Sequence, residues 1–282
     1  MRVGVGLPNA VPGTSPGTLL EWARRADAGP FSSVGVLDRI VYDCYEPFTT
    51  LAAAAAATER VRLVTMIAIG PLRNAAVLAK EAATIHGLSG GRFVLGLAVG
   101  ARADDYAAAG LDPSRRGAML DERLDRICDV WDDDAIGPHS VDGRPEILVG
   151  GTSDVVFGRV ARYADGYVHG GGPPRAFARA ARKARTAWAD AGRPGDVALW
   201  GQGYFALGDD ARDEGLAYMR HSYAFTGPFV ERIVEQTLTT PQAVVQFVRG
   251  YANEGCDELV LFPAVARVDQ LDRLADALSD AS

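Results

Sequence analysis

The chain has 282 residues, of which 48% are hydrophobic and 23% charged, a balance typical of folded globular proteins rather than disordered or fibrous ones. The formal net charge is −7 and the arginines form no basic stripe, which argues against nucleic acid as a partner. The three cysteines lie far apart and the four histidines are not paired at metal spacing, so we expect no disulfide and no metal. Without a signal peptide pattern or a membrane-length apolar stretch, we expect a cytoplasmic protein with no membrane partner.

Short apolar runs alternate with longer segments of helical periodicity along the whole chain. The near-continuous apolar character of these runs is typical of strands in a parallel sheet that is covered on both faces. The predicted strands are Val3–Leu7, Val34–Leu37, Arg62–Ile67, Phe93–Leu97, Ile147–Val149, Gly166–His169, Val197–Leu207 and Glu258–Phe262.

The segments between the strands repeat apolar residues every three or four positions, which predicts helices with one core-facing side. The clearest stripes are Leu78, Ala82 and Ile85; Leu120, Leu124, Ile127 and Trp131; Phe177, Ala181, Ala184 and Trp188; and Leu271, Leu274 and Leu278. Thr240 followed by Pro241 indicates the start of another helix, and Gly255 its end.

Eight strands, each followed by a helix, predict a closed (β/α)8 barrel, the TIM barrel, with residues 1–282 in one domain. A doubly wound open sheet is the alternative, because Gly4 and Gly6 could begin a dinucleotide-binding turn. Asn9 stands where the third glycine of that motif belongs, which weakens this alternative. The segment from Arg212 to Thr239 is longer than one helix requires, so we expect an extra hairpin or flap over the barrel mouth.

In such barrels the chemistry lies at the C-terminal ends of the strands. The residues predicted there include few acids, bases or nucleophiles, which is typical of an enzyme whose cofactor carries the chemistry. They are Pro8, Asn9, Asp38, Arg39, Thr65–Ala68, Val99, Gly100, Asp104, Gly150–Ser153 and His169–Gly172.

Two of these loops are rich in glycine and lead into helices. Gly150-Gly151-Thr152-Ser153 would expose backbone N–H groups and hydroxyls at a helix N-terminus, where the helix dipole favours an anion such as phosphate. The alternative is a plain turn with Thr152 or Ser153 as the N-cap, and the spacing alone does not separate the two. The Gly170–Gly172 loop gives a weaker signal of the same kind.

Several blocks of the sequence are similar to one known family. They are Pro71–Asn74, Leu78–Lys80, Ala83–Ile85, Leu88–Phe93 and Leu95–Gly100, supported by Asp38-Arg39, Val149–Gly151, Ala164–Gly166, Tyr223–Gly227 and Asp257–Leu259. These blocks resemble the bacterial luciferase-like family of flavin- and deazaflavin-dependent oxidoreductases, and the resemblance covers nearly the whole chain.

The resemblance implies a cofactor site at the barrel mouth, with the ring near the ends of strands two to four and the phosphate on the loop after strand five. It also implies a non-proline cis peptide at Met66–Ile67. The candidate cofactor-binding residues are Asp38, Met66, Ile67, Ala68, Asp104, Gly150, Gly151, Thr152, Ser153, Gly170 and Gly171. Asp38, Arg39 and His169 are the candidate catalytic residues.

The sequence departs from the family at two positions. Many members have histidine where this chain has Arg39, and deazaflavin-dependent dehydrogenases often have glutamate near the position of Ala101. Because arginine stays protonated, Arg39 is expected to act as a fixed charge that favours the negative reduced ring. The alternative is that Arg39 pairs with Asp38 or Asp43 and only shapes its loop.

The expected function is that of a luciferase-like oxidoreductase or monooxygenase using FMN or the deazaflavin coenzyme F420 on a small organic substrate. Oxygen insertion and hydride transfer both remain open, as does the choice of cofactor. A non-catalytic flavin-binding barrel is the alternative, supported by the missing histidine and glutamate. A metal-free lyase or hydrolase lacks any acid–base pair that can be named. A homodimer is compatible with the sequence but not required by it.

Overall fold

The computed structural model describes residues 1–133, 135–139 and 143–279. Its strands form one parallel sheet, and the eight predicted strands are confirmed. They are β1 (Arg2–Gly6), β2 (Ser33–Val36), β3 (Arg62–Thr65), β4 (Ala68–Ile69), β5 (Phe93–Ala98), β6 (Glu146–Gly150), β7 (Gly166–His169), β8 (Ala198–Phe205) and β9 (Glu258–Pro263). β3 covers the first four residues of the predicted strand Arg62–Ile67, the pairing is interrupted at Met66 and Ile67, and β4 follows beyond the predicted end.

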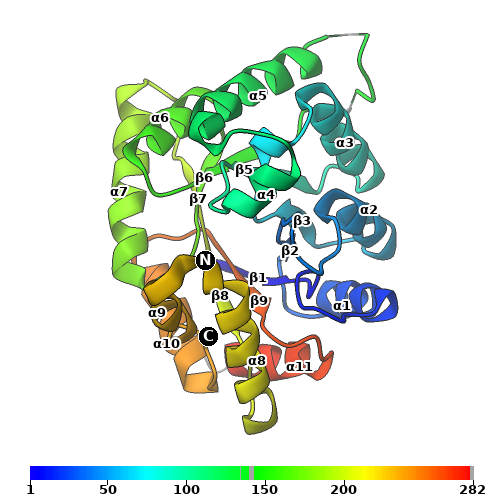
Figure 1. Ribbon diagram of the computed structural model, residues 1–282, viewed down its shortest axis with the longest axis vertical. Helices are drawn as coiled ribbons and strands as arrows, with labels where there is room; N and C mark the ends of the chain where they lie inside the picture. The colour runs from blue at the N-terminus through cyan, green and yellow to red at the C-terminus, as the bar shows by residue number, and fades with distance from the viewer. Residues whose placement is uncertain (134, 140–142, 280–282) are drawn as a thin grey trace.

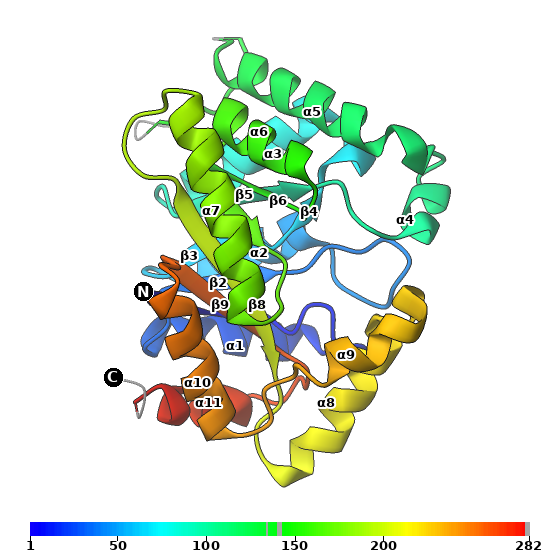
Figure 2. The same cartoon turned by 90° about the vertical axis from the view of Figure 1, so that its left-hand side faces the viewer.

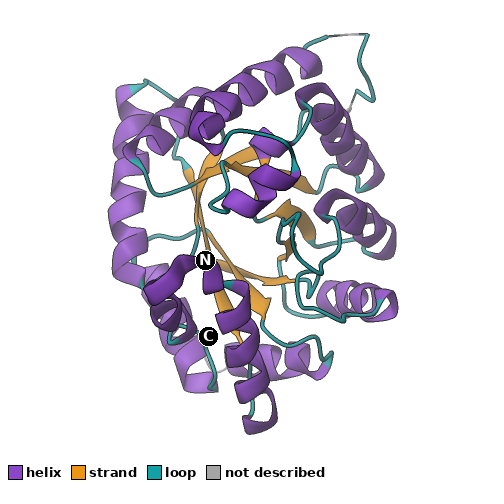
Figure 3. Ribbon diagram, viewed as in Figure 1, coloured by secondary structure: helices purple, strands orange, loops and turns teal. Residues whose placement is uncertain are grey.

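The sheet closes on itself. β1 pairs with β2 on one side and with β9 on the other, and β3 pairs with β5, so the strands form a complete ring. Figures 1 and 3 show this ring with helices around it. The closed (β/α)8 barrel is therefore confirmed, and the open doubly wound sheet is excluded.

Most helices lie on the outside of the barrel, and three lie over its mouth, where the strands end (Figure 2). The surrounding helices are α1 (Pro16–Ala28), α2 (Pro47–Ala57), α3 (Ala75–Leu88), α5 (Arg116–Trp131), α6 (Asp154–Tyr163), α7 (Pro174–Asp190), α10 (Pro241–Asn253) and α11 (Asp269–Ser279). The three at the mouth are α4 (Ala103–Ala108), α8 (Asp209–Ser222) and α9 (Val230–Val234). Short 3-10 turns are η1 (Gly70–Leu72), η2 (Pro113–Arg115) and η3 (Ala224–Phe229).

The buried side chains form two layers. The outer layer lies between strands and helices and contains the predicted helix stripes, such as Leu78, Leu124 and Phe177. The inner layer fills the barrel and includes Phe262, whose ring occupies the space that a side chain on Gly6 would need, at 2.1 Å from a Cβ there. Gly6 is therefore required by barrel packing and not by a dinucleotide.

The segment after β8 forms the flap expected over the mouth, but it is helical and not a hairpin. α8, η3 and α9 follow one another, and Leu238 makes only an isolated bridge to Phe205. The flap is attached to the opposite rim by a hydrogen bond between Tyr42 and His221 and by Arg102 over the Phe225 ring. No helix in the described part of the chain is long and apolar enough to cross a membrane.

Candidate functional site

A cavity of about 890 Å³ opens at the C-terminal ends of the strands, between β4–β5 and β7. Its wall contains seven of the predicted cofactor-binding residues, namely Met66, Ile67, Gly150, Gly151, Thr152, Ser153 and Gly170. The rest of the wall comes from Ala98–Ala101, Ser114, Arg116, Gly117, Val155, Val156, Arg159, Val168 and Gln202. The wall does not include the predicted Asp38, Arg39, Ala68, Asp104, His169 or Gly171.

The glycine loop after β6 forms a bare cradle. A Cβ on Gly150 would lie 2.6 Å from Ile67 Cδ1, and one on Gly151 would lie 2.7 Å from a methyl group of Val156. Gly151 also has a φ of +142°, a conformation that residues with side chains rarely adopt. Ser153 is the N-cap of α6, yet its hydroxyl makes no capping hydrogen bond. The loop therefore presents N–H groups of the first helical turn and an uncommitted hydroxyl to the cavity.

Two arginines supply positive charge to the cavity, and neither was predicted. Arg159 is buried and bound to Asp121 through two hydrogen bonds of 2.6 and 3.0 Å. Arg116 is exposed at the start of α5 and, among the ion pairs of the described residues, it has none. Arg116 is thus the cation that remains available to an anionic ligand.

The floor of the cavity is the interruption between β3 and β4. The Met66–Ile67 peptide bond is cis, as the family resemblance implied. Met66 is buried, whereas Ile67 is partly exposed to the cavity. Just before it, the Thr65 hydroxyl donates to the Gly96 carbonyl and accepts from the Gly96 N–H at 2.9 and 2.8 Å. These bonds tie β3 to β5 directly beneath the floor.

The predicted acids lie beside the cavity and hold loops together. Asp38 Oδ2 accepts hydrogen bonds from the Ile69 N–H (2.8 Å) and from Arg73 (2.9 Å), which fixes the loop after β2 to β4. Asp104 pairs with Arg102. Asp105, which was not singled out, is fully buried and accepts from the backbone of Ile40 and Val41. These carboxylates shape the mouth.

His169 lies behind the glycine loop. The Tyr167 hydroxyl donates to the Gly151 carbonyl (2.8 Å) and lies 3.2 Å from His169 Nδ1. Tyr167 has a single hydroxyl proton, which it donates to the Gly151 carbonyl. In the second hydrogen bond the donor is therefore His169 Nδ1–H, and the Tyr167 oxygen accepts. Burial lowers the pKa of His169 to about 4, so the ring is neutral near pH 7. His169 is thus linked to Gly151 through the Tyr167 hydroxyl and does not line the cavity.

The low pKa of His169 makes the stability of the protein depend on pH. The unfolded chain binds this proton near pH 6.5 and the folded chain only near pH 4, so protonation favours unfolding as the pH falls. From pH 7 to pH 4, wild type is expected to lose about 3 kcal/mol more unfolding free energy than His169→Asn. Urea unfolding of both proteins across this range measures the difference. Parallel pH profiles would contradict the buried neutral state.

Sequence reasoning missed the polar residues of the wall that come from outside the strand ends. Ser114 and Arg116 lie in the η2–α5 turn, and Arg159 lies within α6, where helical periodicity gives no sign of a site. Gln202 lies inside β8 and donates to the Gly170 carbonyl at 3.1 Å. Gln202 is a polar residue within a mostly apolar predicted strand, and this was the one feature of the sequence that could have indicated a wall residue there.

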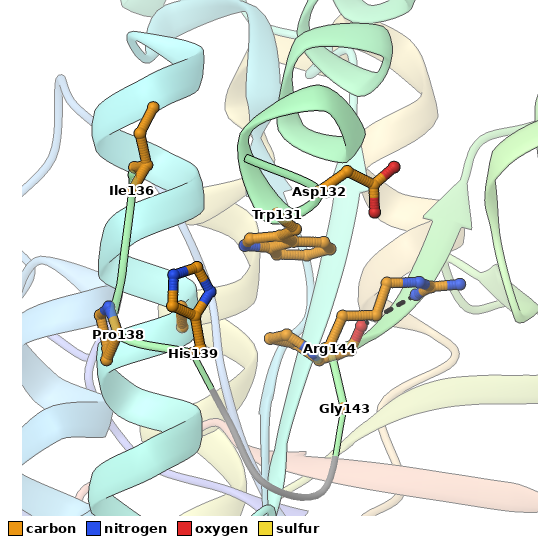
Figure 4. A pocket seen from close by; sticks show the side chains of 9 residues that line it. Trp131, Asp132, Ile136, Pro138, His139, Gly143 and Arg144 are labelled. Atoms are coloured by element: carbon orange, nitrogen blue, oxygen red, sulfur yellow. Dashed lines mark hydrogen bonds between the residues drawn. The ribbon is translucent and has the colours of Figure 1, made fainter. Parts of the chain in front are cut away.

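A smaller hollow of about 250 Å³ lies at the other end of the barrel, where β6 begins (Figure 4). Trp131, Pro138, His139 and Arg144 line it, and Arg144 pairs with Asp165. Residues 140–142, between His139 and Gly143 in the sequence, lie outside the described ranges. Over those ranges, no group of three His, Cys, Asp or Glu side chains could hold a metal ion.

Comparison with known proteins places this geometry in a family. Residues 1–254 match the family model described as luciferase-like monooxygenase. An uncharacterized protein of Mycobacterium tuberculosis is 28% identical over 206 residues, covering 61% of this chain and 71% of the relative. The pyrimidine monooxygenase RutA of Escherichia coli is 31% identical over 200 residues, covering 62% of this chain but only 53% of RutA.

Solved structures share the fold at low sequence identity. An F420-dependent secondary alcohol dehydrogenase, in complex with an F420-acetone adduct, has a TM-score of 0.83 at 17% identity and covers 100% of this chain and 99% of its own. The oxygenating constituent of 3,6-diketocamphane monooxygenase from Pseudomonas putida, in complex with FMN, has a TM-score of 0.74 at 17% identity, covering 99% and 95%. Because the family model matches residues 1–254, the chain belongs to the luciferase-like monooxygenase family.

Proposed function

We propose that this protein is an oxidoreductase that binds FMN or F420 in the mouth cavity, with the phosphate on the Gly150–Ser153 loop and the ring against Met66 and Ile67. The observation that carries the proposal is the bare cradle at Gly150 and Gly151, a backbone loop in the cavity wall that leads into the start of α6. The family relationship supports the same class of chemistry.

The residues around the cradle fit a phosphate. Backbone N–H groups at the start of α6, the Ser153 hydroxyl and the Arg116 guanidinium are donors that lack other strong partners. Asp154, in the first turn of α6, would repel an anion, but it is paired with Lys183. When bound, either cofactor would supply the redox chemistry, and these residues would hold and orient it.

The described wall of the cavity contains no Asp, Glu, His or Cys side chain. Its polar members are hydroxyls, amides and guanidinium groups, which bind and orient but do not exchange protons near neutral pH. The protein's own part in the reaction is therefore binding, orientation and the exclusion of water. The same observation favours a second candidate, a barrel that carries the cofactor without catalysis.

Binding of phosphate-bearing and phosphate-free ring compounds tests the proposal. The cofactor-free protein is titrated with FMN and riboflavin, and with F420 and its phosphate-free deazaflavin, by calorimetry. We expect FMN or F420 to bind at least tenfold more tightly than its phosphate-free counterpart, about 1.4 kcal/mol. If neither phosphate-bearing compound binds, or if the phosphate adds no affinity, the proposed function is wrong.

Reoxidation of the bound, reduced cofactor separates the enzyme from the carrier. An enzyme is expected to change the rate at which oxygen or an added carbonyl compound reoxidises the cofactor. A carrier would leave that rate equal to the rate of the free cofactor in the same solution.

A further inference from the structure

Gln202 is a buried polar side chain in the middle of β8 that points into the barrel. A Cβ on Gly201 would lie 2.5 Å from the Tyr251 ring, so this position faces outward to α10. A Cβ on Gly203 would lie 2.7 Å from the Phe247 ring of the same helix. Because side chains alternate along a strand, Gln202 faces inward, where it lines the mouth cavity with 8% of its surface exposed.

One hydrogen bond fixes the orientation of the Gln202 amide group. Its Nε2 donates to the Gly170 carbonyl at 3.1 Å, and because a carbonyl only accepts, the nitrogen and not the oxygen must face Gly170. One N–H and the oxygen Oε1 are left over. No hydrogen bond within the described residues reaches Oε1, yet Oε1 is not one of the solvent-inaccessible atoms that lack a partner. Oε1 is therefore an acceptor that is open to the cavity.

The other polar side chains of the described wall lie on the side of the Gly150–Ser153 loop. They belong to η2, to the start of α5, to that loop and to α6, and are Ser114, Arg116, Thr152, Ser153 and Arg159. Arg159 donates to the Gly117 carbonyl at 3.0 Å, which holds α6 against the start of α5. Gln202 is the one polar side chain of the described wall that comes from elsewhere, on β8.

The floor between the two polar regions is apolar. A Cβ on Gly150 would lie 2.6 Å from Ile67 Cδ1 and 3.0 Å from Val168 Cγ1, so both side chains adjoin the start of the Gly150–Ser153 loop. Val168 pairs with Trp200, and two residues further along each strand Gly170 meets Gln202. The wall therefore runs from the donors of the loop, across an apolar floor, to the single acceptor on β8.

The polar groups predicted at the end of β2 do not reach this cavity. Arg39 donates to the carbonyl and the hydroxyl of Ser222 at 3.2 Å each. Within the described ranges it forms no ion pair, so the expected pairing with Asp38 or Asp43 is not made. Neither Arg39 nor Asp38 lines the cavity, which leaves Gln202 as the acceptor available to a bound ring.

We propose that Gln202 binds the imide edge of the cofactor ring, with Oε1 accepting a hydrogen bond from the ring N–H that lies between two carbonyl groups. A buried N–H of this kind needs an acceptor, because leaving it unpaired costs more than the bond itself contributes. The second N–H of the amide is available to a neighbouring ring carbonyl. FMN and F420 share the imide edge, so the assignment rests on the proposed function but not on the choice between them.

The test compares FMN with N3-methyl-FMN, which keeps the phosphate but has a methyl group in place of the imide proton. Both are titrated by calorimetry into the cofactor-free protein, and F420 and its N3-methyl derivative are used in the same way if F420 binds more tightly. Wild type is expected to prefer the unmethylated compound at least tenfold, because Oε1 would lose its donor and face a methyl group.

Gln202→Met, which has a similar shape but no amide, should reduce this preference to less than twofold. Gln236→Met is the matched control and should keep the wild-type preference. Gln236 is exposed on the flap side of Gly172, where its Oε1 would lie 3.8 Å from a Cβ, and it does not line the cavity.

Equal binding of the two compounds by wild type would overturn the assignment. A preference that survives in Gln202→Met would overturn it too, because the methyl group would then meet another part of the wall. Should Gln202→Met not fold, the ¹⁵N–¹H resonances of the Gln202 amide in wild type decide, since they must shift more with FMN than with N3-methyl-FMN. If no cofactor binds, the proposed function fails as well, whereas tight binding that is insensitive to methylation contradicts only the role of Gln202.

Discussion

Gly151→Val is expected to weaken FMN or F420 binding at least tenfold, and by far more if the phosphate lies directly on this loop. The substituted side chain would collide with Val156, a neighbouring residue of the cavity wall, because its Cβ would lie 2.7 Å from a methyl group of that residue. The φ of +142° at this position adds backbone strain in any residue with a side chain. Calorimetric titration of the cofactor measures the loss, which exceeds about 1.4 kcal/mol.

A second substitution separates blocked binding from a damaged fold. Val156→Ala removes the methyl group nearest the new side chain, so the double variant should regain thermal stability without regaining affinity. Gly158→Ala is the control on the same helix, because a Cβ there meets no atom within 4 Å. If the double variant regained its affinity for the cofactor, the weaker binding of Gly151→Val would be due to displacement of the loop by the collision with Val156, and not to a side chain in the cradle.

Gly96→Ala is expected to lower the unfolding free energy by about 3 kcal/mol or more. A Cβ on Gly96 would lie 2.1 Å from the Thr65 carbonyl oxygen, and backbone cannot yield as a flexible side chain does. The β3–β5 contact that completes the ring would have to open, together with both Thr65 hydrogen bonds. For a chain of this size the melting temperature should fall by roughly 6–12 °C, as calorimetry would show.

Gly87→Ala is the matched control for this effect. Gly87 lies on the exposed side of α3 and a Cβ there meets nothing within 4 Å, so alanine should leave stability unchanged or raise it by about 1 kcal/mol. If both variants melt at the wild-type temperature, the close approach of Gly96 to Thr65 is not important for the barrel.

The barrel was predictable because its strands are covered on both faces and therefore read as continuous apolar runs. The β6 and β7 strands, Glu146–Gly150 and Gly166–His169, lie within a residue of their predicted positions for this reason. The flap was harder to predict. A segment such as Asp209–Ser222 packs one side on the mouth and exposes the other, and its connection to Leu238 depends on contacts with β8 that no local pattern reveals.

The candidate site was predictable only where it is formed by backbone atoms of a glycine-rich loop. The glycines of the Gly150–Ser153 loop are visible in any sequence, and the structure brings them to the cavity wall with Met66 and Ile67. Arg116 and Gln202 were missed because their role depends on the tertiary placement of a helix start and of a strand interior. Asp38 was placed correctly on its loop, but its carboxylate is bound by Arg73, which lies 35 residues further along the chain.

The pairing of β1 with both β2 and β9, which closes the barrel, also affects how the chain folds. β1 precedes the other strands of the barrel in the sequence, yet one of its two neighbours is β9, and Arg2 can pair with Glu258 only after β9 has been made. Until then β1 has an unsatisfied edge, and so does each newly added strand of the growing sheet. Contacts between such distant parts of a sequence form slowly, because a long loop must close before they bring any gain. The nascent protein therefore passes through an open, edge-exposing sheet, the stage at which association with other chains competes with completion of the barrel.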